Sequence, residues 1–231
     1  MFNNRLFLLA FFVALLGLNG VNPPKSIAQS TSEPASPDTG TPEGQQGVGG
    51  TRPETSCPDT ENKHLMALVQ GRGQDLTRQE NPEIWVYIPY FSEDISYLEL
   101  SVHDRNLTQT FYRTAIEVTD SPGLIKIPIS YTLAPNETYR WYFKLYCKPH
   151  QPGENTKYYY LQNWIQHQPD ASVETSWYDR ITETGDRYFS ARDNPQIQEE
   201  WKSLLTSLNL PDWLWQEPFV DSIIVPPDER N

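Results

Sequence analysis

The stretch Tyr139-Arg-Trp-Tyr-Phe-Lys-Leu-Tyr-Cys147 decides the fold, because it has the most strand-like pattern in the chain. Five side chains fall on one face at a period of two and four fall on the other: Tyr139, Trp141, Phe143, Leu145 and Cys147 against Arg140, Tyr142, Lys144 and Tyr146. This alternation predicts a half-buried strand that ends in a cysteine. We therefore expect the rest of the domain to pack around it.

Shorter alternating runs surround this strand between Cys57 and His167, separated by clusters of turn-forming residues. The other predicted strands are Glu83–Tyr90, Leu98–Val102, Thr110–Val118, Leu124–Ile129 and Tyr158–His167. Many short strands joined by turns are typical of β-sandwiches. We predict a mainly β fold, an Ig-like or fibronectin-like antiparallel β-sandwich of six or seven strands over residues 57–168.

The pattern changes to a helical period after Pro169. Val173, Trp177 and Ile181 recur at every fourth position and predict a first helix. It ends at Gly185 or continues to about Ala191, and we favour the longer helix because Tyr188 falls near the apolar stripe. A second helix is predicted after Asn194-Pro195, a good cap followed by a good first helical residue. Residues 169–231 are thus predicted to form a C-terminal helical extension packed on one sheet.

The N-terminus has the three parts of a secretory signal: a basic residue, an apolar run of about 13 residues and a small-x-small cleavage site at Ser26-Ile27-Ala28. The apolar run is shorter than the roughly 20 residues that a membrane-spanning helix needs. We predict a signal peptide at residues 1–28, export to the periplasm or cell surface, and no transmembrane segment after cleavage. Residues 29–56 are rich in Pro, Gly, Ser and Thr and contain no aromatic residue, which predicts a disordered linker, either a spacer or simply an unstructured N-terminus.

Cys57 and Cys147 are the two cysteines of the chain and lie 90 positions apart. In an exported protein two cysteines without a CxxC motif predict one structural disulfide. The alternative is a pair of buried free thiols.

Composition excludes some classes of function. The formal net charge of -12 argues against a nucleic-acid partner, because an acidic protein repels phosphates. The four histidines stand in no metal-binding or metalloprotease motif, and no nucleophile elbow or phosphate loop is present. We therefore predict no metal, no cofactor and no catalytic residue, although an enzyme of unknown type stays open as an alternative.

Tyrosines form the one unusual surface candidate. Tyr158, Tyr159 and Tyr160 must divide between two faces of a strand, so at least one of them points outward. Tyr142 and Tyr146 point outward from the neighbouring strand in the predicted register. We predict a possible binding surface at Tyr142, Tyr146, Tyr158, Tyr159 and Tyr160, which could anchor a protein or stack on a sugar. Alternatively, the C-terminal helices cover this face.

The segment Leu133-Ala-Pro-Asn-Glu-Thr-Tyr139 is similar to the tyrosine corner of fibronectin type III domains. This resemblance implies a hydrogen bond between the Tyr139 hydroxyl and the backbone a few residues upstream. The alternative is an unrelated loop before a strand.

Several stretches, taken in order, resemble a family of exported cyanobacterial domains known as domain of unknown function 928. They are Gly50-Thr-Arg52, Cys57-Pro58, Leu65–Val69, Ile84–Tyr90, Pro122–Ile125, Tyr139–Phe143 with Cys147, Asn163–Ile165 and Trp177–Asp179. The resemblance covers about residues 50–210. It implies export and these domain boundaries, and it carries no catalytic residue over.

Together the patterns predict an exported, non-catalytic protein-interaction module. The alternative is a carbohydrate-binding module that uses the tyrosines. An exposed coplanar row of tyrosine rings would favour the sugar.

Overall fold

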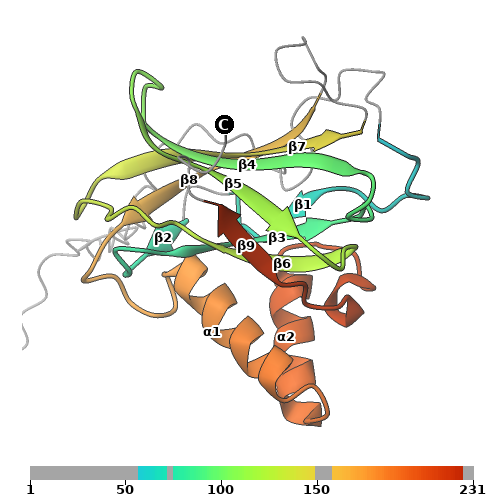
Figure 1. Cartoon of the computed structure of the whole chain (residues 1–231). Coiled ribbons are helices and arrows are strands. Elements are labelled where there is room, and N and C mark those ends of the chain that lie inside the picture. The colour runs from blue at the N-terminus through green and yellow to red at the C-terminus, as the bar shows by residue number, and fades with distance from the viewer. Residues whose placement is uncertain (1–56, 72–74, 149–157, 226–231) are drawn as a thin grey trace, which may run out of the picture. The chain divides into compact units, whose positions relative to one another are not determined.

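The computed structural model describes residues 57–71, 75–148 and 158–225. The predicted signal peptide at residues 1–28 and linker at residues 29–56 lie outside these ranges. The described elements (Figure 1) are β1 (Met66–Ala67), β2 (Leu76–Thr77), β3 (Glu83–Ile88), β4 (Ile95–Asp104), β5 (Thr110–Val118), β6 (Gly123–Pro128), β7 (Thr138–Cys147), β8 (Tyr159–His167), α1 (Trp177–Ser190), α2 (Pro195–Ser207), the 3-10 helix η1 (Leu214–Gln216) and β9 (Ser222–Val225).

The described strands form two sheets, so the fold is mainly β with two helices after the main strands. One sheet has the order β1-β3-β6 and the other has the order β2-β8-β7-β4-β5-β9. All six predicted strands are present, whereas β1, β2 and β9 were not predicted. The expectation of a wholly antiparallel sheet is wrong at one edge, because the two-residue strand β2 pairs with β8 in parallel.

β7 lies inside the six-stranded sheet between β4 and β8, as the pattern of its sequence predicts. Its buried and half-buried residues alternate along the whole strand. Trp141, Phe143 and Leu145 are fully buried and face Ile84, Val86 and other residues of the three-stranded sheet in one hydrophobic core. The core between the sheets therefore forms from the inward-facing residues of both sheets.

The disulfide predicted from the cysteine spacing joins Cys57 to Cys147, with the Cα atoms 5.0 Å apart. This bond fixes Cys57, which precedes β1, to the last residue of β7. The alternative of two free thiols is excluded.

The loop before β7 contains the hydrogen bond that the tyrosine-corner likeness implies. The backbone N–H of Ala134 donates to the Tyr139 hydroxyl over 2.9 Å. Tyr139 itself is buried, so this contact fixes the turn that leads into β7.

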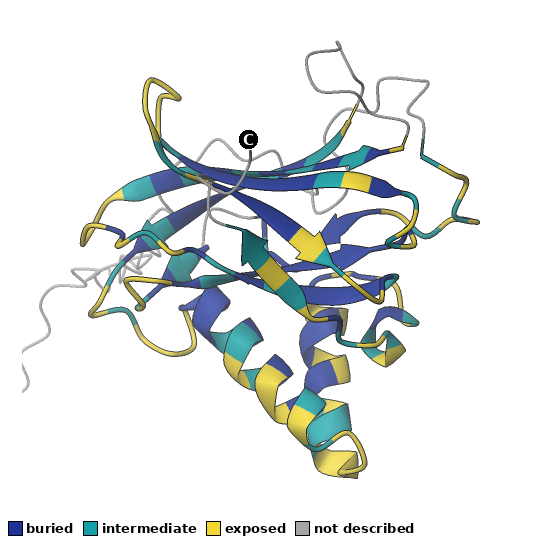
Figure 2. Cartoon of the chain, in the orientation of Figure 1, coloured by how far each residue is buried: buried dark blue, intermediate teal, exposed yellow. Residues whose placement is uncertain are grey.

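The helices pack on the outer face of the three-stranded sheet, where Figure 1 shows them below β3 and β6. Trp85 and Tyr87 of β3 are buried in a second hydrophobic cluster with Trp177 of α1 and Trp201 of α2. The exposed sides of both helices face away from the sheet in Figure 2. The prediction that the extension packs on one sheet is confirmed.

Helix α1 continues through Gly185 to Ser190, as the longer of the two predicted helices does. Gly185 is needed because a Cβ atom there would lie 2.6 Å from Cη2 of Trp85. The expected helical position of Val173 is wrong, because Val173 precedes the helix and is exposed. In α2 the Asn194 side chain accepts hydrogen bonds from the backbone N–H groups of Gln196 and Ile197, so the predicted cap is confirmed.

The chain returns to the sheets after α2, so the expectation of a purely helical extension is wrong. Val220 donates a backbone hydrogen bond to Leu124 of β6, and β9 then pairs antiparallel with β5. The tail thus connects the edge of one sheet to the edge of the other. The sequence pattern does not predict β9, because a run of three apolar residues after a helical region carries no clear period.

Candidate functional site

The outer face of the six-stranded sheet carries the predicted tyrosines. The strand registers place outward side chains of β4, β7 and β8 in rows across the sheet. These rows are Tyr97 with Tyr146; Glu99 with Lys144 and Tyr160; Ser101 with Tyr142 and Gln162; and His103 with Arg140 and Trp164. Aromatic, cationic and hydrogen-bonding groups therefore share one face.

Four tyrosines form a connected group on this face, which we call the tyrosine face: Tyr142, Tyr146, Tyr158 and Tyr160. The ring centroids of Tyr146 and Tyr158 are 5.0 Å apart, and Tyr160 lies 6.3 Å from both Tyr142 and Tyr158. The planes of these neighbouring rings meet at angles of 41° to 60°. The rings are therefore tilted against one another and do not form a coplanar row.

Tyr159 does not belong to this group, which corrects its place among the candidate residues. It packs against the core between the sheets and stacks on Tyr90 with centroids 5.9 Å apart. Because neighbouring residues of a strand point to opposite sides, Tyr158 and Tyr160 face outward when Tyr159 faces inward.

The helices do not cover the tyrosine face, so the alternative that they do is wrong. α1 and α2 pack against the outer side of β3 and β6, in the other sheet. Tyr158 is 36% exposed, and Tyr142, Tyr146 and Tyr160 are half-buried by their neighbours within the sheet.

A groove of about 670 Å³ lies on this face. Its lining residues are Ser101, His103, Leu107, Thr110, Arg140, Tyr142, Lys144, Tyr158, Tyr160 and Gln162. Two of them are cationic and none carries a carboxylate. The groove therefore differs in charge from the chain as a whole.

The two cations are held in place by aromatic and amide partners. The guanidinium carbon of Arg140 lies 5.2 Å from the ring centroids of both Tyr142 and Trp164, and Arg140 donates to Oε1 of Gln162 over 2.6 Å. Lys144 lies 5.4 Å from the ring centroid of Tyr158. Contacts of this kind fix long side chains without cancelling their charge.

Glu99 is the carboxylate next to the groove, and it is shared. It is buried, with its Oε1 3.2 Å from Lys144 and its Oε2 3.5 Å from Arg113. One negative charge thus faces two positive charges, and the surroundings stay positive on balance.

His103 lies at one end of the groove, with Nε2 2.9 Å from Oγ of Ser101 and Nδ1 3.0 Å from Oγ1 of Thr110. Burial, followed by the positive charges of Arg113 and Lys144, lowers the pKa of His103 below its usual value. Loss of the proton on this histidine is the response expected in a positive environment.

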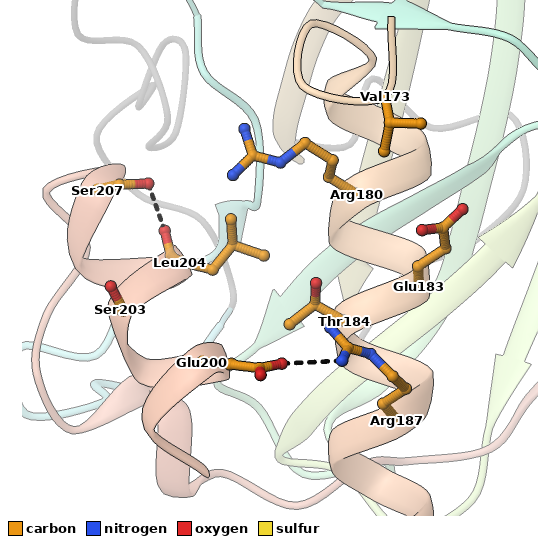
Figure 3. Close-up of a pocket in the computed structure, with 9 residues that line it drawn as sticks. All are labelled: Val173, Arg180, Glu183, Thr184, Arg187, Glu200, Ser203, Leu204 and Ser207. Carbon is orange, nitrogen blue, oxygen red and sulfur yellow. Dashed lines mark hydrogen bonds and ion pairs between the residues drawn. The ribbon is translucent and has the colours of Figure 1, made fainter. Parts of the chain in front are cut away.

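Three other grooves have different chemistry. The groove between α1 and α2 has a volume of about 450 Å³, and Figure 3 shows Arg187 and Glu200 paired across it, 2.9 Å apart. A groove near Pro82 is lined by three carboxylates and no cation, and one near Phe91 by three carboxylates and one lysine. Each of these three grooves is lined by at least one carboxylate, whereas the groove on the tyrosine face combines rings and two cations without a carboxylate.

Within the part of the chain that the structure describes, no group of three or more His, Cys, Asp or Glu side chains is placed to hold a metal ion. His64 is exposed, whereas His167 is buried with Nδ1 2.8 Å from the Leu133 carbonyl. Of the helices in these residues, none has the length and apolar character to cross a membrane.

The sequence predicts the tyrosines as site residues, whereas it assigns the cations between them to the same face but not to the site. Arg140 and Lys144 alternate with Tyr142 and Tyr146 along β7, so the same period that assigns the tyrosines to the outer face assigns the cations to it. His103 and Gln162 come from the neighbouring strands β4 and β8. Their place in the groove depends on how these strands pair with β7, and that register cannot be read from the sequence.

Residues 47–176, more than half of the chain, match the family described as Domain of Unknown Function (DUF928). The chain belongs to this family. The match ends just before α1, so it is shorter than the resemblance expected over residues 50–210, and it includes β4, β7 and β8 with the whole tyrosine face. No curated protein and no solved structure matches the chain.

Proposed function

We propose that this protein is a non-catalytic interaction module and that its tyrosine face binds a protein partner. The observation that carries the proposal is a groove of about 670 Å³ that no described helix or strand covers, where tyrosine rings and two cations lie together on a sheet. Tyrosine and arginine are among the residue types most enriched at the energetic centres of protein interfaces.

The rigidity of the face supports this proposal. Its tyrosines stand on the neighbouring strands β7 and β8 or directly before β8, and the disulfide fixes the end of β7. Side chains that are already ordered lose little conformational entropy when a partner binds. Little of the free energy gained from contacts with the rings is then offset by the cost of ordering side chains.

The tilt of the rings favours a protein over a sugar. A carbohydrate surface that stacks pyranose rings needs exposed aromatic planes in a row, whereas the neighbouring planes here meet at 41° to 60°. Rings at varied angles suit the uneven surface of a polypeptide. Carbohydrate binding is therefore an outcome that the experiment must test rather than the expected function.

An immunoglobulin-like sandwich is the finer fold that we propose for the two sheets. The orders β1-β3-β6 and β8-β7-β4-β5 correspond to strands A-B-E and G-F-C-C′ of that architecture. The hydrogen bond between Ala134 and the Tyr139 hydroxyl, at the start of the strand that corresponds to F, supports the same assignment.

Export to the periplasm or cell surface is part of the proposal. The predicted signal peptide supports it, and so does the disulfide, since such bonds form and persist in oxidising compartments. The site itself is proposed to act outside the cytoplasm.

The experiment is affinity capture from an extract of the host's cell envelope, with the bound proteins identified by mass spectrometry. The purified protein is compared with the double variant Tyr142→Ala/Tyr160→Ala and with Phe91→Ala as a control. Phe91 is an aromatic residue that is 59% exposed and does not line the groove.

We expect a partner that the protein and the Phe91 variant both retain and that the double variant loses. Equal capture by all three proteins would contradict the proposal. A glycan array run on the same three proteins detects the carbohydrate alternative.

A further inference from the structure

The charge of the groove on the tyrosine face is opposite to that of the chain. The chain has 30 acidic and 18 basic residues, yet the groove lining holds Arg140 and Lys144 and no carboxylate. A positive groove on an acidic protein selects for a negatively charged partner and disfavours contact with another copy of the same acidic surface.

Both cations can accept a new carboxylate. Among the described residues no carboxylate lies within ion-pair distance of Arg140, whose described partners are Gln162 and two aromatic rings. Lys144 shares Glu99 with Arg113, so Glu99 keeps a cationic partner if Lys144 turns to a ligand. A ligand carboxylate would therefore not leave a buried charge unpaired.

The spacing of the groups matches an extended polypeptide. Arg140, Tyr142 and Lys144 stand at alternate positions of β7, and a strand rises about 3.3 Å per residue. The two cations are thus separated by about 13 Å of strand, with a tyrosine between them. An extended chain that lies along β7 presents its own side chains at the same intervals.

We infer that the partner of the tyrosine face is an acidic polypeptide segment in an extended conformation. Two of its carboxylates, four positions apart, pair with Arg140 and Lys144, and the apolar side chain midway between them lies against Tyr142. This inference rests on the proposed function, because it names the chemistry of the partner that the same face binds.

The experiment selects random peptides of about twelve residues, displayed on phage, against the purified protein. Peptides that also bind the Tyr142→Ala variant are removed. We expect the remaining peptides to contain more Asp and Glu than the library, with pairs at four-residue spacing that flank an apolar residue.

Individual selected peptides are then measured by isothermal titration calorimetry. Each of Arg140→Gln and Lys144→Gln should weaken binding about tenfold or more, because each removes one charge-assisted contact. Arg187→Gln is the matched control, since it removes the same charge from the groove between α1 and α2. Binding should also weaken as salt is raised.

The outcomes separate the two proposals. Tyr142-dependent peptides without acidic enrichment, or with acidic residues at no preferred spacing, would overturn the inference and leave the proposed function intact. If no Tyr142-dependent peptide is selected, the proposed function fails. Tyr142-dependent binding of polygalacturonate in its place would assign the face to acidic sugars and overturn both.

Discussion

The two sheets each have an outer face rich in aromatic residues, but the described helices cover only one of these faces. On the three-stranded sheet, Trp85 and Tyr87 are at most 1% exposed beneath α1 and α2. On the six-stranded sheet, Tyr142 and Tyr160 remain partly exposed to solvent, and no described element packs over them. The difference lies in what stands between the rings.

The residues between the aromatic side chains decide whether a face is covered. β3 reads Glu83-Ile-Trp-Val-Tyr-Ile88, an almost continuous apolar run, and such runs are buried on both sides. β7 alternates, and its outward positions combine tyrosine with Arg140 and Lys144. Covering those cations with an apolar helix would cost several kcal/mol per charge. Aromatic content alone therefore does not distinguish a packing surface from a binding surface.

Removal of the cover should have the largest effect. Deletion of residues 170–231 exposes Trp85, Tyr87 and Leu124, and we expect the truncated protein to aggregate because a large apolar patch then meets water. Size-exclusion chromatography with light scattering measures this. Substitution of Trp85→Lys and Tyr87→Lys in the truncated chain should reduce the aggregation. A truncated protein that stays monomeric with an unchanged Tm would show that the helices are a separate unit.

The next largest effect is expected at the centre of the covered face. Trp85 is 1% exposed and donates its indole N–H to Oγ1 of Thr182 over 3.0 Å. Trp85→Ala should lower the free energy of unfolding by about 3–5 kcal/mol, measured by urea denaturation. Gly185→Ala should also destabilise the protein, by about 1–3 kcal/mol, because its new Cβ meets the Trp85 ring.

Combining Trp85→Ala with Gly185→Ala in one protein tests whether the two positions are energetically coupled. In the Trp85→Ala background the added methyl group of Gly185→Ala finds space, so the second substitution should cost much less. Equal costs of Gly185→Ala in both backgrounds would show that the contact with Trp85 does not limit the position.

A smaller effect, dependent on pH, is expected where α1 meets the sheets. Asp75 is 3% exposed, and burial raises its pKa to about 7, although backbone hydrogen bonds from Gly71 and Gln70 and the Asn163 side chain act in the opposite direction. The raised pKa means that the folded protein binds the proton more tightly than the unfolded chain does. The stability from Asp75 is therefore complete below pH 4 and is lost as pH rises through 7.

Asp75→Asn should remove this dependence. The free energy of unfolding of the unmodified protein should fall by a few kcal/mol, relative to that of the variant, between pH 4 and pH 8, since about 1.4 kcal/mol corresponds to each pKa unit. Urea denaturation at several pH values measures the difference. Parallel profiles for the two proteins would show that Asp75 does not titrate in this range. The tyrosine face lies on the other side of the sheet, and we expect its variants to leave the profile unchanged.

Local patterns predicted the strands and helices well, and long-range contacts explain what they missed. The period-two run around Trp141 and the cap at Asn194 are local signals, and both are confirmed. β2 and β9 owe their pairing to β8 and β5, which are far away in the sequence. The same distance explains the site: Tyr142 could be assigned to the outer face, but its neighbours His103 and Gln162 come together only through the register of three strands.

The smallest effect on stability should come from the tyrosine face, together with a large effect on binding. Tyr142 is half-buried and its described contacts are with His103, Tyr160 and Arg140 at the surface, so Tyr142→Ala should lower the free energy of unfolding by about 1 kcal/mol or less. Thermal melting measures this cost beside that of Trp85→Ala. The same variant should lose the partner captured by the unmodified protein, because an aromatic residue at the centre of an interface contributes about 2 kcal/mol or more. A large loss of stability without loss of binding would contradict this contrast between the two faces. The tyrosine face would then stabilise the fold, as the covered face does, and its groove would not be the binding site.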